Sequence, residues 1–200
     1  MLARCEGQTV VEVRDLVMEA VPDHKRHLWK PLVGDLPQVD SRIATLSAQP
    51  TYIVEADQVR REWAVTHKPL DEVKTFFLRK IETDAEAARL KHITGGVGMA
   101  MTYQEKFAQA QAVQAMGKDA ANALTKEARE AQFPTLSASV GLEADTLWDC
   151  AQLVLQRYTA FAQLSMVIER TRLSAKKAVS AAMTVAEAAA AYDAVTWPIQ

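Results

Sequence analysis

The sequence predicts an α+β protein, with a small N-terminal antiparallel β part followed by an all-α bundle that contains one long heptad-like helix. Three observations lead to this prediction. Short β-prone runs separated by turn residues occupy the chain up to residue 68. After Pro69 the apolar residues recur at steps of three or four, and from Leu147 onward they recur every seven residues. We therefore expect a β-rich N-terminal docking part at 1–68 and an α-helical bundle at 69–200.

Two hairpins are expected in the N-terminal part. The runs 1–5 and 9–13 flank Glu6-Gly7-Gln8, and the runs 51–55 and 59–66 flank Ala56-Asp57-Gln58. Turn residues between β-prone runs are typical of hairpins. In the last run one face carries Val59, Arg61, Trp63 and Val65, which predicts a sheet covered on one side. Between the hairpins, a stretch rich in Pro, Asp and Gly holds one further expected strand at Leu28-Trp29.

Several helices are expected after Pro69. The apolar spacing predicts the first from Leu70 to about His92, and the glycines within 94–98 end it. Thr102 and Glu105 form a capping-box pattern, which predicts that the next helix begins there and runs to about Met116. Residues 118–132 continue as helix, and Phe133-Pro134 interrupts it.

The longest predicted helix begins near Asp145. Its seven-residue period consists of Leu147, Val154, Phe161, Ile168, Ala175 and Ala182, and predicts about 35 helical residues. The first half is also apolar off this seam, so we expect it to be covered on several sides. The seam can pack inside a bundle formed by one chain, which we favour, or it can join copies of the chain. Thr184 and Glu187 form a second capping-box pattern, which opens a short last helix through Val195.

Composition narrows the class of protein. The chain is 49% hydrophobic and 24% charged, with a formal net charge of −2, which is typical of a globular protein. Basic residues lie beside acids throughout, so no nucleic-acid partner is expected. No apolar run is as long as a membrane span, which needs about 18 residues. The N-terminus lacks the pattern of a signal peptide. Cys5 and Cys150 can form a disulfide, but we favour two reduced cysteines.

The residues predict no catalytic, cofactor or metal site. His24 and His27 are three apart but lack the further ligands of a zinc site. The glycines at 95–98 lack the ending of a phosphate-binding loop. Neighbouring carboxylates lie next to basic residues, which indicates ion pairs. We therefore expect a non-enzymatic protein whose surface binds partners, since aromatic and apolar side chains dominate interfaces. The candidate interface residues are Trp29, Trp63, Leu147, Val154, Phe161 and Ile168.

Several segments resemble those of a known group of proteins. A strand-strand-helix module is formed by residues 49–55, 59–65 and 69–74. It is followed by a glycine-containing helix junction at 91–103, a Pro-to-Val-Gly turn at 134–141 and a C-terminal signature from Thr184 to Pro198. Together, residues 45–198 resemble small tail-region proteins of tailed bacteriophages and prophages, a tail-fibre-related family of unknown function. Thr94-Gly95-Gly96 departs from the family, which has a proline near this junction.

The resemblance implies a structural component of the virion tail region, associated with the baseplate, the fibres or a collar. Its partners would be other tail or fibre proteins, and it would form a homo-oligomer, with a trimer favoured. It would be made in the cytoplasm of the bacterial host. An alternative is a tail-fibre assembly chaperone that is absent from the mature virion. A wall- or polysaccharide-degrading enzyme would need a pair of carboxylates in a pocket, and no pair in the sequence stands out.

Overall fold

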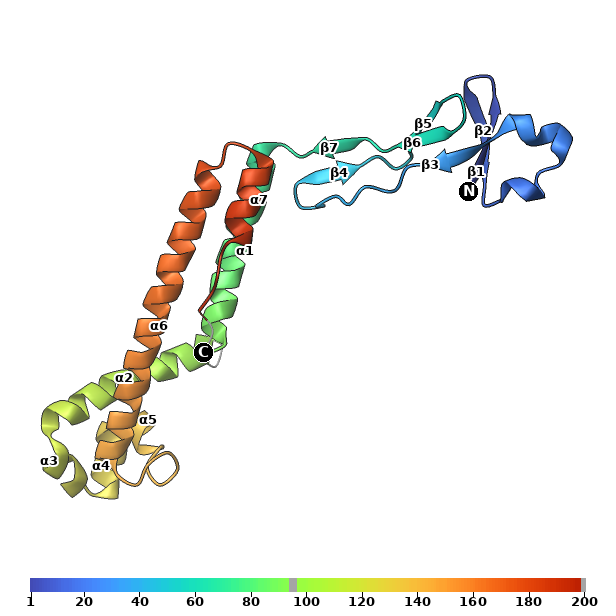
Figure 1. Cartoon of the computed structure of the whole chain (residues 1–200). Coiled ribbons are helices and arrows are strands. Elements are labelled where there is room, and N and C mark those ends of the chain that lie inside the picture. Colours follow the sequence, from blue (N-terminus) through green and yellow to red (C-terminus); the bar gives the residue numbers. More distant parts are fainter. Residues whose placement is uncertain (94–96, 199–200) are drawn as a thin grey trace. The chain divides into compact units, whose positions relative to one another are not determined.

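The computed structural model describes residues 1–93 and 97–198 (Figure 1). It confirms the predicted α+β class, because the strands end at His67 and the first α-helix begins at Leu70. The chain divides into two compact units. One comprises Met1–Phe76 with Ala182–Ala190, and the other comprises Phe77–Ala181 with the residues from Ala191 onward. Of the segment 94–98 predicted to break the helix, residues 94–96 lie outside the described residues, and residues 97 and 98 already belong to the next helix, so the break does not extend to Gly98.

Five strands form a sheet in the first unit. They are β1 (Leu2–Glu6), β2 (Thr9–Arg14), β3 (Trp29–Val33), β5 (Thr51–Val54) and β6 (Val59–Glu62), in the order β2-β1-β3-β6-β5. The pairs β1–β2 and β5–β6 are antiparallel, which confirms both predicted hairpins. Pairing between β3 and β6 is parallel. Ala3, Cys5 and Val59 form the buried core of this sheet.

A second sheet corrects the prediction for residues 59–66. That run is two strands, because β6 ends at Glu62 and β7 (Val65–His67) pairs antiparallel with β4 (Ala44–Leu46). Ser47 interrupts the run between β6 and β7. Its backbone N–H donates to the carbonyl of Ala64, and its Oγ accepts from the N–H of Ala64. Val65 is 45% exposed, so the predicted apolar face does not continue past this point. β4 has too short an apolar run to be recognised in the sequence.

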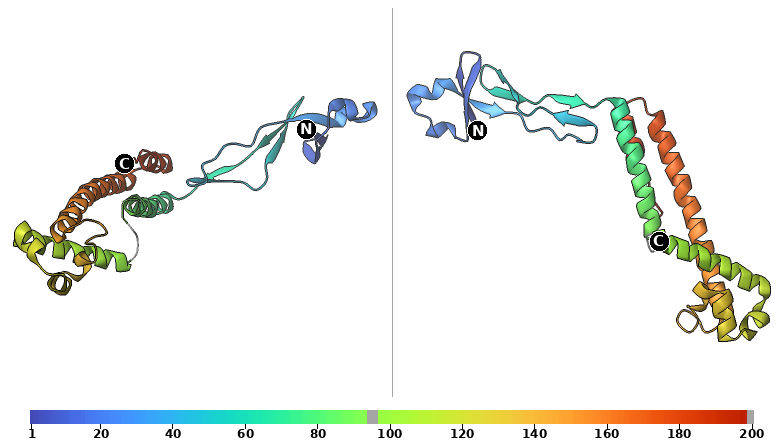
Figure 2. Two further views of the ribbon diagram at one scale, coloured as in Figure 1. Left: turned by 90° about the horizontal axis from the view of Figure 1, so that it is seen from below. Right: turned by 180° about the vertical axis from the view of Figure 1, so that it is seen from behind.

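Two 3₁₀ helices, η1 (Met18–Ala20) and η2 (Asp23–Leu28), lie between β2 and β3. The strand expected at Leu28-Trp29 is β3, which begins at Trp29 directly after η2. Figure 2 shows the strands and these short helices from two further sides.

Three of the predicted helices are present with nearly the expected bounds. The apolar spacing at steps of three or four selects Leu70 and five further residues, and α1 (Leu70–Leu90) buries these five, Val73, Phe77, Ile81, Ala85 and Ala88, whereas Leu70 is half-buried. α6 (Leu147–Ala181) has 35 residues, as the heptad pattern predicts. Ala85 and Ala88 of α1 form one core cluster with Ile168 of α6, and Trp197 packs against it. The capping pattern at Thr184 and Glu187 opens α7 (Val185–Asp193), where the N–H of Glu187 donates to Thr184 Oγ1.

Four shorter elements lie between α1 and α6. They are α2 (Val97–Met116), α3 (Lys118–Ala123), α4 (Lys126–Gln132) and α5 (Pro134–Ser137). α2 begins five residues before the predicted start at Thr102, since Met and Ala in that stretch are strong helix formers. The helix predicted over 118–132 is two helices, because Thr125 caps the second by accepting from the N–H of Ala128.

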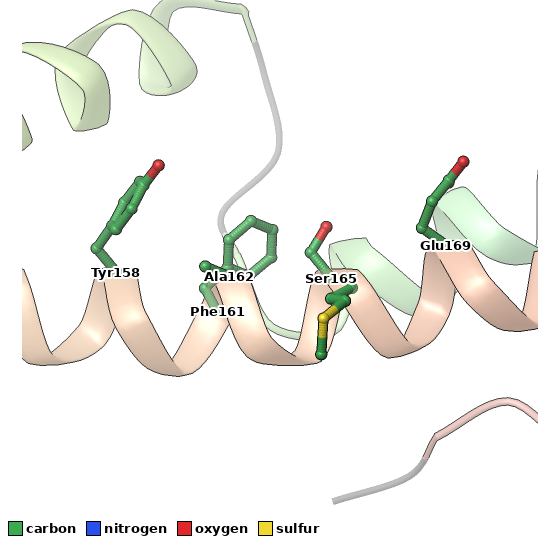
Figure 3. A pocket seen from close by; sticks show the side chains of 6 residues that line it. Tyr158, Phe161, Ala162, Ser165 and Glu169 are labelled. Atoms are coloured by element: carbon green, nitrogen blue, oxygen red, sulfur yellow. The ribbon is translucent and has the colours of Figure 1, made fainter.

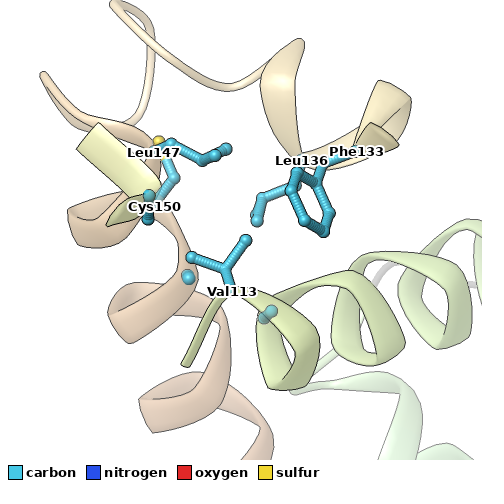
Figure 4. Packing of buried hydrophobic residues seen from close by; sticks show 8 residues of the cluster. Val113, Phe133, Leu136, Leu147 and Cys150 are labelled. Carbon is cyan, nitrogen blue, oxygen red and sulfur yellow. The ribbon is translucent and has the colours of Figure 1, made fainter. Parts of the chain in front are cut away.

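These elements pack on the start of α6 through a second apolar core. Val113, Phe133, Leu136, Leu147 and Cys150 converge there from α2, the α4–α5 junction and α6 (Figure 4). These elements cover α6 only over its first turns, because all residues from 156 to 160 are exposed. The prediction that the first half of this helix is covered on several sides is therefore wrong beyond its first turns.

Candidate interaction surface

The six predicted interface residues do not come together. Leu147 and Ile168 are fully buried inside the chain, in two different apolar clusters. Val154 is half-buried and packs against the cluster that contains Leu147. Trp29 and Trp63 are half-buried in the β part. Phe161 lines an open depression on the described surface.

That depression, the α6 groove, is a shallow open surface along one helix. Its lining residues are Tyr158, Phe161, Ala162, Ser165, Met166 and Glu169. Tyr158, Ser165 and Glu169 project from the same side of α6 (Figure 3). Met166 is 66% exposed, and the groove is otherwise mainly apolar. The arrangement can hold an apolar side chain or a helix face but has no enclosed space for a small molecule.

Helical geometry explains why the groove faces outward. Positions 158, 162, 165 and 169 are three or four residues apart, so they share one face of α6. Ile168, Ala175 and Val179 lie on the neighbouring face and are buried. At one end of the groove the ring of Phe107 in α2 stacks on Tyr158, with 3.7 Å between ring centroids. This contact orients the Tyr158 ring without covering it.

At the other end of the groove lies the carboxylate of Glu169, which two arginines hold in place. Glu169 Oε1 accepts from Arg172 Nη2 at 2.6 Å, and Glu169 Oε2 accepts from Arg89 Nη2 of α1 at 2.8 Å. The hydrogen bonds from Arg172, with the charges of both arginines, lower the pKa of Glu169. The carboxylate therefore stays ionised at neutral pH, and two guanidinium groups balance its charge.

Sequence reasoning missed Tyr158, Met166 and Glu169. Tyr158 and Met166 belong to an apolar stripe offset from the seven-residue seam of α6, and Glu169 lies at the end of this stripe, where it meets Arg89 of α1. The seam has the more regular period in the sequence, yet its residues Leu147, Ile168 and Ala175 pack inside the chain. This favours the reading in which the seam belongs to a bundle formed by one chain.

A polar cluster next to α6 was also missed. Lys106 Nζ donates to Ser139 Oγ at 2.6 Å, and Ser139 Oγ donates to Glu143 Oε1 at 3.0 Å. Glu143 also pairs with Lys106 at 2.9 Å and with Arg157 at 2.8 Å. A serine beside a lysine can act as a nucleophile with its base. Here the serine proton goes to the carboxylate and Ser139 is buried, so the cluster anchors the loop before α6.

His24 and His27 lie in η2 and are exposed. Within residues 1–93 and 97–198, no group of three His, Cys, Asp or Glu residues is arranged to hold a metal ion. Cys5 and Cys150 are both buried as free thiols, in separate cores. Among the described helices, none combines the length and apolarity that crossing a membrane requires.

Comparison with known proteins gives no match: no family model, no curated protein and no solved structure is significantly similar to this chain.

Proposed function

We propose that this protein is a structural component of the tail region of a tailed bacteriophage, associated with the baseplate, the fibres or a collar. It acts through protein–protein contacts. The observation that carries this proposal is the α6 groove, where Tyr158, Phe161 and Met166 form an open apolar surface. Apolar patches exposed together on a folded chain mark sites of interaction with other proteins.

The chemistry of the groove indicates the kind of partner. A strip of apolar side chains along a helix fits the apolar face of another helix. The Glu169 carboxylate is already balanced by Arg89 and Arg172, so the partner needs hydrogen-bond donors at that end and no strong charge. The resemblance of residues 45–198 to small tail-region proteins of phages supports a tail or fibre protein as this partner.

Quantitative mass spectrometry of purified particles of the encoding phage tests the proposal. We expect this chain in the particles at a fixed small multiple of three or six copies per tail. If it is absent from particles but abundant in the lysate of infected cells, the proposal is wrong and a tail-fibre assembly chaperone is the better description.

A matched pair of substitutions tests the groove itself. Met166→Glu places a charge on the exposed apolar rim of the groove, and we expect at least about a tenfold loss of the chain from particles because a charge left unpaired under a bound partner costs several kcal/mol. Leu142→Glu places the same charge at a side chain that is exposed outside the groove and should leave incorporation unchanged. Equal incorporation of both variants would show that the groove is not the binding surface.

A further inference from the structure

The β4–β7 ribbon has an open edge along β7, whereas the edge of β4 is blocked at its start. Ser47 N–H donates to the carbonyl of Ala64, and Lys68 N–H donates to the carbonyl of Ile43. Antiparallel pairs alternate between hydrogen-bonded and non-hydrogen-bonded ones, so Val65 and His67 direct their backbone N–H and C=O groups away from β4. On the other strand, the N–H of Ala44 donates to the carbonyl of Asp40, which occupies the outward N–H at the start of β4.

β7 is a short edge strand without the Lys, Arg, Asp or Glu side chains that protect many edges. All three of its residues are exposed, it contains no proline, and the described chain places no other strand along its outer side (Figure 1). Unprotected edges pair with further strands. A ribbon of two short strands is also marginally stable by itself, so a further strand on β7 would stabilise it.

The sequence around β7 is complementary to itself in one antiparallel register. With a two-fold axis at Val65, Glu62 lies opposite Lys68 of the second copy, and Trp63 lies opposite His67. An axis at Ala64 would instead bring Arg60 against Lys68, and an axis at Thr66 would set Trp63 against Pro69, which has no N–H. The axis at Val65 therefore combines opposite charges with outward-directed backbone groups.

We propose that two copies of this chain pair through the outer edges of β7, antiparallel and in register at Val65, to form a four-stranded sheet. Val65 lies opposite Val65 of the second copy as a hydrogen-bonded pair. One face of the sheet combines Leu46 and Val65 of both copies, because side chains of directly opposed residues share a face. The opposite face carries the two Glu62–Lys68 pairs. This inference does not depend on the proposed tail function.

The first test is the mass of the full-length chain by sedimentation equilibrium. We expect a concentration-dependent dimer. Val65→Pro removes the N–H at the two-fold axis, which β4 does not use, and we expect it to raise the dimer dissociation constant at least about tenfold. Val65→Lys, which brings two like charges together, should act in the same direction. Circular dichroism checks that both variants keep the fold.

The register is tested by charge exchange. Glu62→Lys should weaken the dimer several-fold, and adding Lys68→Glu should restore it. Within one chain Glu62 pairs with Arg60, which Lys68→Glu leaves unchanged, so recovery reports the pair between copies.

Cross-linking tests the same axis directly. Opposed residues in a hydrogen-bonded pair have Cα atoms about 5.5 Å apart, within the range of a disulfide. Val65→Cys should therefore form a disulfide-linked dimer under mild oxidation, whereas Thr45→Cys on β4 should not. A monomer at about 100 μM, a trimer, or a dimer that neither Val65→Pro nor Val65→Lys weakens and that Val65→Cys does not cross-link would overturn the inference.

Discussion

Arg172 of α6 donates from Nη1 to Glu82 Oε1 of α1 at 2.6 Å, and the same guanidinium holds Glu169 of its own helix. Lys176 also pairs with Glu82, and Arg89 of α1 reaches Glu169. These ion pairs join α1 and α6 along the border of the apolar cluster of Ala85, Ala88 and Ile168. Their order shows that the two helices run antiparallel, since the later residues of α1 meet the earlier residues of α6.

Replacing Arg172 should loosen this helix pair. The Arg172 side chain is 18% exposed and donates hydrogen bonds to the carboxylates of Glu82 and Glu169. Arg172→Ala therefore removes a donor from each of them. We expect the free energy of unfolding to fall by about 1–2 kcal/mol in urea titrations. Arg170→Ala is the matched control, because Arg170 is exposed on the same helix and has no ion pair in the described part of the chain. Equal effects of the two substitutions would contradict the role of Arg172.

The same cluster predicts how stability depends on pH. Hydrogen bonding by Lys176, with the charge of Arg172, lowers the pKa of Glu82, and the hydrogen bond from Arg172 lowers that of Glu169. A lowered folded-state pKa contributes stability that is present above the unfolded value of about 4.3 and is lost as pH falls through the folded value. We therefore expect the free energy of unfolding to decrease between about pH 5 and about pH 3.

Glu82→Gln combined with Glu169→Gln should make this decrease shallower, as measured by urea unfolding at a series of pH values. Glu130→Gln removes an exposed carboxylate on α4 whose ion pair with Lys126 is 3.8 Å long, and it should leave the slope nearly unchanged. A double variant with the slope of the wild-type chain would rule out the cluster as the source of the pH dependence.

The elements that could be predicted are those with a strong local signal. Apolar spacing located α1 within two residues of its end and gave the length of α6, and the capping box at Thr184 located α7. β4 and the switch of β7 to a second sheet depend on Ser47, which bonds Ala64 from far along the chain. The α6 groove depends on which side of α6 the partners α1 and α2 leave open. Periodicity in one helix carries no information on such partners.

Tyr192 of α7 predicts a second stability effect. Its hydroxyl donates to Asp84 Oδ2 at 2.7 Å, and its ring stacks on Phe77 with 4.9 Å between centroids. Tyr192→Phe keeps the ring and removes the hydrogen bond, so it should cost about 1 kcal/mol. Tyr192→Ala also removes the stacking and should cost about 3 kcal/mol. Tyr158→Phe, at a ring whose hydroxyl has no described partner, should change the free energy of unfolding little.

The Asp84 carboxyl provides a direct readout of this contact. Burial raises its pKa, but the hydrogen bonds from Lys80 and Tyr192 outweigh burial, so its pKa is lowered. Tyr192→Phe should therefore raise the pKa of Asp84, measured from the carboxyl carbon shift in an NMR titration. An unchanged pKa would show that the hydroxyl does not donate to Asp84 in solution.

Gly34, at the end of β3, predicts the largest effect in the β part. Its φ is +100°, a conformation that side chains disfavour, and a Cβ at this position would lie 2.5 Å from the backbone oxygen of Arg61. Arg61 also donates from Nε to the carbonyl of Gly34, which holds the two backbones together. Gly34→Ala should therefore cost at least about 3 kcal/mol and speed hydrogen exchange of the β3 and β6 amides.

Gly7 provides the matched control for Gly34. Its φ is also positive, at +64°, but nothing lies within 4 Å of a Cβ placed there. Gly7→Ala therefore carries only the conformational cost of about 1 kcal/mol, and the β3 and β6 amides should keep their protection. The comparison separates backbone strain from steric overlap. Similar exchange rates in the two variants would mean that the close approach of Gly34 to Arg61 does not limit the sheet.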